Sequence, residues 1–433
     1  MSPVDLPIDE ALDHVLAEAL DAATPVPLFD NAAMDGYALR AADVHPGRRL
    51  RVVGEVRAGQ VAQDPVGEGR AVRVMTGAPI PPGADAVVPW ERTRTPASGD
   101  RPVDHLADEL PAWVVVDGDV DPGRHVRRAG EDLEPGDPVA AAGVLVGPAE
   151  VALACAGGHH TLRVVPTPVV AVLSTGDEVA GRGEQLAGPR VPDVDGPALA
   201  ALARRHGATV LRVGPVPDEP DALAAALDEL AGRADLVVTS GGASGGAADL
   251  VARLGRSGHP VEALSLAMKP GKPLCLGWLD IAPGPGGGRV PFIGLPGNPV
   301  AAMVAFEVFA GPVIARLRGL DGSSRVLEAV ATEPLPGAEG KVSYVRVRLE
   351  RRPDGTLAAG PTGGDRPHGP RSLVATDGLA VVDSAGGVAA GEPVLVRVTG
   401  WSGTSRAAGG GRPLHVGEPS SARPGGPDLP CEH

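Results

Sequence analysis

Three stretches of the chain combine glycines with polar residues in a way that suits the binding of an anion. The stretches are VLSTGDEV, SGGASGGAADL and GLPGNP, and each follows a short apolar run. Glycine lets the backbone approach a ligand closely, and the N–H groups of glycine-rich turns and helix starts bind phosphate. Nearby carboxylates supply the oxygen ligands that Mg²⁺ prefers when it bridges phosphates. We therefore expect a phosphate-bearing, nucleotide-like ligand at these stretches.

The polar atoms of each stretch lie where an apolar run ends. Asn298 is placed to cap a helix that starts at Pro299. The set is not a Walker A loop, because no GK[ST] follows, and its glycine spacing differs from the dinucleotide fingerprint. The candidate ligand-contacting residues are Ser174, Thr175, Gly176, Glu178, Gly241, Gly242, Ser244, Asp249, Pro296, Gly297 and Asn298.

A lysine pair marks a second kind of anion chemistry. Only three of the 39 basic Lys and Arg residues are lysines, and two of them, Lys269 and Lys272, fall in the segment MKPGKP. Its prolines predict a stiff loop. Lysine is a compact point charge that suits phosphate or another small oxyanion, so we favour a binding role over a solvated surface loop.

Three further segments hold candidate site residues in the first third of the chain. NAAMDGYAL places Asp35 in a turn, VRVMTGAPIPPG places Thr76 at the end of a strand, and RRAGEDLEPGD contains Asp132. Taken alone, each segment is more typical of a structural turn or a charged loop than of a site.

Strands and helices alternate from residue 166 onward. The runs PVVAVLST, ATVLRV, LVVTS and VPFIGL predict strands, and residues 197–206, 220–231 and 299–317 predict helices. This alternation indicates an α/β domain with a mostly parallel sheet. In such sheets, ligands bind outside the carboxyl ends of the strands, where the three glycine-containing stretches begin.

The remaining segments predict β structure around the α/β domain. Apolar residues at helical spacing predict a helix at residues 8–20, and short strands with turns follow. The fold class we expect is α/β plus β, in several domains. The expected parts are a discontinuous N-terminal domain (1–26 and 126–165), an inserted β-rich domain (27–125), an α/β domain (166–318), a C-terminal β barrel (319–400) and a disordered tail (401–433).

Composition excludes several classes of protein. The formal net charge of −15 argues against nucleic-acid binding, so an anionic substrate would need local cations and backbone N–H groups. No uncharged run of 18 apolar residues occurs and the N-terminus lacks a secretory signal, so neither a membrane span nor secretion is expected. The three cysteines form no metal-binding pattern, which is typical of the reducing cytoplasm.

Together these segments resemble one family, the molybdopterin molybdenumtransferases, which include the C-terminal domain of gephyrin. The motifs NAAMDGYA, RVMTGAPIPPGADAVV, RRAGEDLEPGD, VLSTGDEV, SGGASGGAAD, MKPGKP and GLPGNPVAA occur in the family's order and at about its spacing, over roughly residues 5–400. The resemblance implies a homodimeric enzyme of four-part subunits. Its α/β domain would bind adenylylated molybdopterin, and Mg²⁺ and molybdate would then give molybdenum cofactor and AMP.

The resemblance also implies roles for individual residues. Asp35 and Thr76 would reach the site from the partner subunit. Glu178, Asp218 and Asp249 would serve the metal and the pyrophosphate. Lys269 and Lys272 would hold molybdate or phosphate. The same matching places Asp132 among the catalytic residues, and Pro273 and Arg346 among those that bind substrate. The molybdopterin adenylyltransferase is a further expected partner.

The chain departs from the family pattern at four places. Asp193-Val194-Asp195 replaces a D-S-N-like triplet, GGASGG replaces G-G-V-S-x-G, and Ala301 and Pro370 stand where relatives commonly have serine. Two other functions are alternatives. Adenylylation of molybdopterin uses a short single α/β domain, and a non-enzymatic scaffold would need partner-binding insertions between the motifs. The full-length resemblance argues against the first, and the motif spacing against the second.

Overall fold

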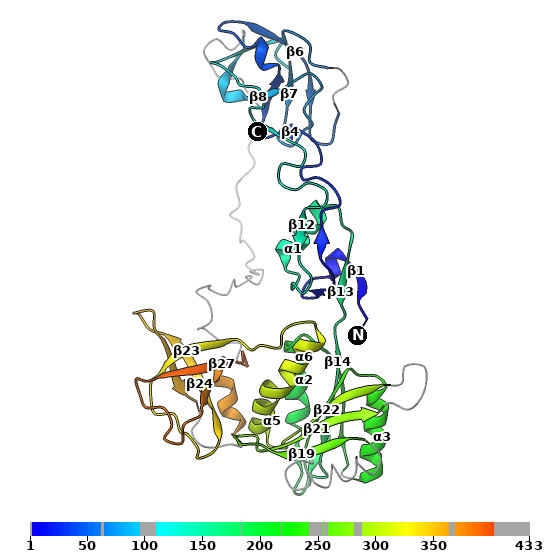
Figure 1. Cartoon of the computed structure of the whole chain (residues 1–433), viewed down its shortest axis with the longest axis vertical. Coiled ribbons are helices and arrows are strands. Elements are labelled where there is room, and N and C mark those ends of the chain that lie inside the picture. Colours follow the sequence, from blue (N-terminus) through cyan, green and yellow to red (C-terminus); the bar gives the residue numbers. More distant parts are fainter. Residues whose placement is uncertain are drawn as a thin grey trace, which may run out of the picture. The chain divides into compact units, whose positions relative to one another are not determined.

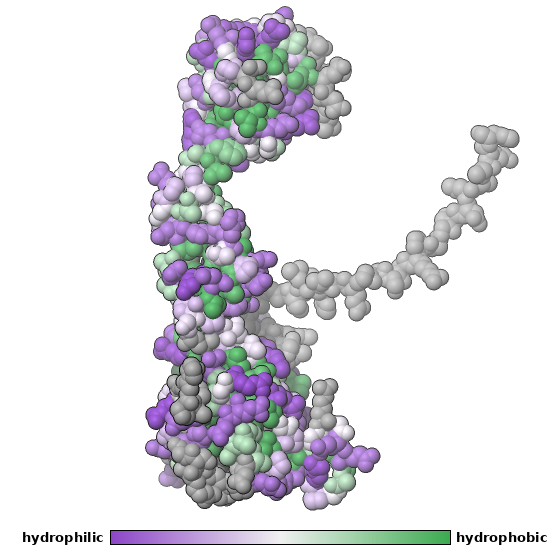
Figure 2. Space-filling model, turned by 90° about the vertical axis from the view of Figure 1, so that its right-hand side faces the viewer, coloured by the Kyte–Doolittle hydropathy of each residue, from purple (hydrophilic) through white to green (hydrophobic). Residues whose placement is uncertain are grey.

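The computed structural model describes residues 2–61, 65–95, 110–181, 183–217, 219–241, 254, 259–280, 288–362 and 369–401. The chain divides into two compact units. The first contains residues 1–168 and 315–321, and the second contains residues 169–314 and 322–433. Hydrophilic side chains lie over much of the visible face of both units (Figure 2).

A six-stranded β sheet forms one part of the first unit (Figure 1). Its core contains Tyr37, Leu39, Leu50 and Val114, all at most 1% exposed. Gly36 is required here, because a Cβ atom at this position would overlap the carbonyl oxygen of Val88 on the neighbouring strand. In spatial order the strands are β8 (Ala86–Pro89), β5 (Gly36–Leu39), β7 (Arg70–Val74), β6 (Arg49–Val56), β10 (Trp113–Val116) and β9 (Thr93–Arg94).

The N-terminus and residues 126–165 build the other part of the first unit. A three-stranded sheet has the order β1-β13-β2, and two further strand pairs, β3 with β12 and β4 with β11, accompany it. The elements are β1 (Val4–Pro7), β2 (Val15–Leu16), β3 (Leu20–Asp21), β4 (Asn31–Ala32), β11 (Val126–Arg127), β12 (Pro138–Ala140), α1 (Pro148–Ala156) and β13 (Thr161–Val165).

The prediction of a helix at residues 8–20 is wrong. Only a short 3-10 turn forms at Ile8–Glu10, and the φ of 64° at Asp13 is incompatible with a helix that continues through this residue. The backbone N–H of Leu16 donates to the carbonyl of Val144, 2.9 Å away, so a distant segment takes the hydrogen bond that a helix would have made internally. Val15 and Leu16 are buried, but Leu12, expected on the same face, is 47% exposed. Tertiary pairing has overridden the helical spacing of the apolar residues.

The α/β domain of the second unit confirms the expected alternation of strands and helices. Its sheet has the order β17-β14-β18-β22-β21-β19, in which the first four strands are parallel and the last two are antiparallel to their neighbours. The strands are β14 (Val169–Thr175), β17 (Thr209–Val216), β18 (Leu236–Ser240), β19 (Val261–Ser265), β21 (Pro273–Asp280) and β22 (Arg289–Leu295). Helices α2 (Asp195–Arg205) and α3 (Pro220–Ala231) connect the parallel strands.

The long apolar helix at residues 299–317 has three parts. An α-helix, α5 (Pro299–Ala305), passes through a π-helical turn at Phe306–Ala310 into α6 (Gly311–Leu317). Its length and composition alone would allow it to cross a membrane, but 56% of the apolar window is buried. Val300, Val304 and Phe306 are fully buried, as in a core helix of an α/β layer.

The C-terminal part of the second unit confirms the expected β barrel. Strands β24 (Val342–Arg351), β25 (Leu357–Pro361), β23 (Val326–Ala331), β27 (Pro393–Val398) and β26 (Gly378–Val382) pair in this order, and β26 pairs with β24 to close the barrel. A two-residue strand, β20 (Met268–Lys269), pairs with β24 and so joins the MKPGKP segment to the barrel. The expected tail after Trp401 lies outside the described residues.

Candidate active site

The three glycine-containing stretches meet at the carboxyl edge of the α/β sheet. The strand register aligns Ser174, in β14, with Ser240, the last residue of β18. It also aligns Ser240 with Leu295, the last residue of β22, and Pro296 follows directly. Three segments that are far apart in the sequence therefore present their ends side by side.

Glycine allows these ends to pack closely. Gly241 has a φ of 96°, and a Cβ atom there would lie 2.5 Å from the carbonyl oxygen of Thr175. A Cβ atom on Gly297 would lie 3.3 Å from the Cα of Gly241. Asn298 accepts hydrogen bonds from the N–H groups of Val300 and Ala301, at 3.2 and 3.3 Å, and so caps α5 as expected.

Two serine–aspartate hydrogen bonds cross this edge, and their acids, Asp193 and Asp195, are site residues that the sequence motifs did not predict. Ser174 donates to Asp193 at 2.8 Å, and Ser240 donates to Asp195. Asp193 also accepts from Arg212 and from the N–H of Gly196, at 2.7 and 2.9 Å. The sequence contains a signal for both acids. Asp195 begins α2 and Asp193 lies two residues before it, and helices that follow parallel strands start on the ligand-binding side of the sheet.

Asp195 is a buried carboxyl group in the middle of this edge. Its residue is 8% exposed, and its Oδ1 atom is buried without a hydrogen-bond partner. Burial is the main cause that raises the pKa of Asp195 to about 6; the hydrogen bond from Ser240 opposes this shift, and the nearby charge of Asp193 adds to it. The carboxyl group therefore changes its protonation state in the weakly acidic range, closer to neutral pH than an ordinary aspartate does.

The MKPGKP segment lies at the same edge of the sheet. Because β21 is antiparallel to β22, its first residue, Pro273, lies near the carboxyl end of β22. Lys272 precedes it and is exposed, and its carbonyl accepts a hydrogen bond from the N–H of Leu266 at 2.8 Å. Lys269 lies in β20 opposite Ser343 of the barrel. The two lysines thus lie between the α/β sheet and the barrel.

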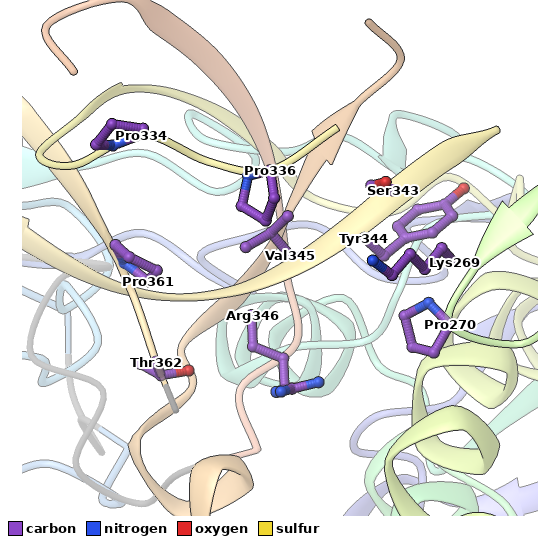
Figure 3. A pocket seen from close by; sticks show the side chains of 10 residues that line it. All are labelled: Lys269, Pro270, Pro334, Pro336, Ser343, Tyr344, Val345, Arg346, Pro361 and Thr362. Atoms are coloured by element: carbon purple, nitrogen blue, oxygen red, sulfur yellow. The ribbon is translucent and has the colours of Figure 1, made fainter. Parts of the chain in front are cut away.

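A cavity of about 390 Å³ opens between this segment and the barrel, and we call it the Lys269–Arg346 cavity. Figure 3 shows Lys269 next to Tyr344 at one side of the cavity, with Arg346 between Lys269 and Thr362. The residue Arg346 is only 7% exposed, and it forms part of the cavity wall. The cavity is lined by Lys269, Pro270, Pro334, Pro336, Ser343, Tyr344, Val345, Arg346, Pro361 and Thr362. Two cations in one cavity can bind a small oxyanion.

The first unit brings two other candidate residues together. Asp35 accepts hydrogen bonds from both the N–H and the hydroxyl of Thr76, at 2.6 and 2.8 Å, although 41 residues separate them. Both side chains are exposed. Asp132 is also exposed, and its N–H donates to the carbonyl of Val26 at 3.0 Å. These three residues belong to the first unit, whereas the other described candidates belong to the second.

The expected metal ligands are only partly described. Glu178 is exposed just beyond the end of β14, where its carboxylate oxygens suit Mg²⁺. Asp218, Gly242, Ser244 and Asp249 lie outside the described residues. Within the described ranges, no group of three or more His, Cys, Asp or Glu side chains is arranged to hold a metal ion.

Three family models match the chain in consecutive segments. The MoeA N-terminal region (domain I and II) matches residues 1–158, and the probable molybdopterin binding domain matches residues 171–316. The MoeA C-terminal region (domain IV) matches residues 328–398. The motifs that carry the resemblance lie in the first two of these segments, and the third match extends it to the barrel.

Curated relatives and solved structures agree with these models. The chain is 36% identical to molybdopterin molybdenumtransferase 2 of Mycobacterium tuberculosis, over 87% of this chain and 90% of that protein. It is 32% identical to molybdopterin molybdenumtransferase of Haemophilus influenzae, over 90% and 92% of the two chains. The crystal structure of a molybdopterin biosynthesis MoeA protein from Pyrococcus horikoshii superposes with a TM-score of 0.74 at 27% identity, covering 92% of this chain and 94% of that one.

Proposed function

Because this chain belongs to the molybdopterin molybdenumtransferase family, and so to molybdenum cofactor biosynthesis, we propose that it inserts molybdate into adenylylated molybdopterin. The proposed reaction depends on Mg²⁺ and releases AMP. The observation that carries the proposal is the position of the Lys269–Arg346 cavity, which adjoins the loop at the carboxyl edge of the α/β sheet within one unit.

Both proposed substrates are anions that must be held close together. The pyrophosphate of an adenylylated pterin suits the glycine-rich carboxyl edge around Gly241 and Gly297, because backbone N–H groups of such turns and helix starts bind phosphate. Molybdate is a dianion and suits the cavity between Lys269 and Arg346. Lys272, between the two places, would offset the repulsion between the anions. Positioning and charge compensation are then the main contributions of the protein.

Glu178, together with Asp218 and Asp249, would hold the Mg²⁺ ion. When bound, this ion stabilises the negative charge that develops on the departing phosphate. Asp195 accepts a hydrogen bond from Ser240 at the end of β18, so it would orient the edge on which the pyrophosphate would bind.

We further propose a homodimer whose sites are shared between subunits. Asp35 and Thr76 hydrogen-bond each other on the surface of the first unit, and this exposed pair would complete the site of the partner subunit. The free cysteines Cys155 and Cys275 are consistent with the cytoplasm as the compartment. The adenylyltransferase that makes the substrate is a proposed transient partner.

A reconstitution experiment tests the reaction. The full chain is incubated with adenylylated molybdopterin, and AMP release and active cofactor are measured with and without molybdate and Mg²⁺. We expect both products only when both ions are present. A rate of AMP release that is the same with and without molybdate would contradict the proposed insertion. Formation of adenylylated molybdopterin from ATP and molybdopterin would instead identify the preceding step of the pathway.

A further inference from the structure

A second cavity lies on the barrel beside the Lys269–Arg346 cavity. It has a volume of about 580 Å³ and is lined by Arg348, Gly360, Pro361, Thr362, Gly369, Arg371, Ser372 and Ala375. Pro361 and Thr362 belong to the walls of both cavities. The two cavities are therefore neighbours on one face of the barrel.

The strand geometry explains why arginines line this face. Val345, Val347 and Leu349 of β24 pack into the barrel core, so the alternate residues Arg346 and Arg348 lie on the outer face. Residues two apart on one face are about 7 Å from each other. The register places Gly360 opposite Arg348, and a Cβ atom at Gly360 would lie 3.0 Å from the hydroxyl oxygen of Thr332.

The arginines are available to a ligand. Arg348 and Arg371 are exposed, and neither forms a salt bridge with a carboxylate among the residues that the structure describes. A guanidinium group offers five N–H donors and commonly binds tetrahedral oxyanions through two of them. In a chain with a net charge of −15, two such cations in one cavity mark a local site of positive potential.

The hydroxyl groups of this cavity are already engaged. Thr376 donates to the carbonyl of Ser372 at 2.9 Å, so the hydrogen between Thr376 and Thr362 must come from Thr362. Ser372 donates to the carbonyl of Gly369, also at 2.9 Å. Both lining hydroxyls therefore use their hydrogens within the protein, and the two arginines supply the donors for an anion.

We propose that Arg348 and Arg371 form a second oxyanion subsite, which takes a tetrahedral dianion and supplies it to the Lys269–Arg346 cavity. The identification of that dianion as molybdate rests on the proposed function. Sulfate and phosphate share its shape and charge, so the anion chemistry can be tested separately. A subsite next to the reaction cavity raises the local concentration of an anion that the acidic protein otherwise repels.

The test compares binding with turnover on the full chain. Equilibrium dialysis with molybdate, sulfate or phosphate alone measures oxyanion binding without the pterin. The variant Arg348→Gln/Arg371→Gln removes both charges at similar side-chain length, and Arg348→Lys/Arg371→Lys restores the charge. Arg352→Gln is the matched control, because Arg352 is exposed just beyond β24 and outside both cavities.

We expect the double glutamine variant to bind molybdate roughly three- to tenfold more weakly, with partial recovery in the lysine variant and no change in the control. In turnover, the molybdate concentration for half-maximal AMP release rises, while the maximal rate is unchanged. Wild-type binding by the glutamine variant, or an equal loss in Arg352→Gln, overturns the subsite. If the wild type releases no AMP but the binding differences persist, the subsite stands and the proposed function fails. Comparison of the three anions shows which dianion the subsite prefers.

Discussion

The hydroxyl of Ser240 donates to the carboxyl group of Asp195, and it also lies 3.4 Å from the carbonyl oxygen of Pro296. This single hydroxyl therefore connects the start of α2, the end of β18 and the turn after β22. A hydroxyl has one hydrogen to donate. When Asp195 is protonated, its own O–H can donate to Ser240, which frees the Ser240 hydrogen for Pro296. The charge of Asp195 thus decides which segments of the site are joined.

The first prediction concerns pH and stability. Burial raises the pKa of Asp195 from 3.8 to about 6 in the folded protein. A raised folded-state pKa contributes stability that is complete below the unfolded pKa and is lost as the pH rises through the folded value. Asp195→Asn keeps an acceptor for Ser240 and removes the titration. We compare the free energy of unfolding of the variant with that of wild type. This difference should shift in favour of the variant by roughly 2 kcal/mol from pH 4 to pH 7.

Thermal unfolding at pH 4.5 and pH 7.5 measures this gain. At each pH, the melting temperature of wild type is subtracted from that of the variant. This difference should be several degrees larger at pH 7.5 than at pH 4.5. Ser174→Ala is a useful control, because it removes a hydrogen bond to the neighbouring Asp193 and leaves Asp195 in place. A difference that is the same at both pH values would show that Asp195 does not titrate in this range.

The second prediction tests the close packing of the strand ends. Gly241→Ala places a Cβ atom 2.5 Å from the Thr175 carbonyl oxygen, in a residue with a φ of 96°. We expect a loss of roughly 2–4 kcal/mol in the free energy of unfolding, because both the contact and the backbone conformation are unfavourable. Gly143→Ala provides the comparison, since Gly143 also has a positive φ, 84°, but no atom lies within 4 Å of the added Cβ. Denaturant unfolding should show the larger loss at Gly241.

The third prediction concerns sites shared between subunits. Asp35→Asn and Asp249→Asn should each fold normally and fail to release AMP, because each removes a carboxylate of the proposed site. If Asp35 acts on the partner's α/β domain, a mixture of the two variants forms hybrid dimers with one intact site. We expect up to about a quarter of wild-type activity from a mixture that exchanges subunits at random. Subunit exchange, verified with tagged chains, without any recovery of activity would rule out this arrangement.

The sequence was sufficient to predict the α/β domain, because its elements follow from local patterns. Pro220–Ala231 forms the expected helix, and β18 and β22 end where glycine and proline stop their apolar runs. The edge containing Ser174, Ser240 and Pro296 followed from the rule that parallel strands present their carboxyl ends together. These inferences needed only short-range information.

The features that were missed depend on long-range pairing. Val15 and Leu16 have helical spacing with Ile8 and Leu12, but β13 and residues 144–146 supply the hydrogen bonds that decide their conformation. The partnership of Asp195 with Ser240 joins residues 45 apart, and no local pattern indicates it. The cavity lined by Arg348 and Arg371 likewise depends on the register between β24 and β25, which places Gly360 opposite Arg348.

The remaining predictions concern molybdate binding, first at the two positions where the family resemblance implies serine. Ala301 is 7% exposed near the start of α5, and Pro370 begins the short 3-10 helix of the barrel. Ser372 does not replace the missing donors in the present arrangement, because its hydroxyl donates to the Gly369 carbonyl at 2.9 Å. A hydrogen bond to a charged ligand is worth about 1.5–3 kcal/mol. Ala301→Ser should therefore lower the molybdate concentration needed for half-maximal AMP release by roughly tenfold.

Lys272→Ala should have the opposite effect, because it removes a cation between the sheet edge and the cavity. We expect the molybdate requirement to rise roughly tenfold or more, whereas the affinity for the adenylylated pterin changes less. Lys341→Ala serves as the control, since Lys341 is exposed and does not line the Lys269–Arg346 cavity. Titration of molybdate at saturating pterin measures all three variants. An unchanged requirement in Lys272→Ala would place the oxyanion site away from the MKPGKP segment, and an unchanged requirement in Ala301→Ser would show that position 301 does not face the bound oxyanion.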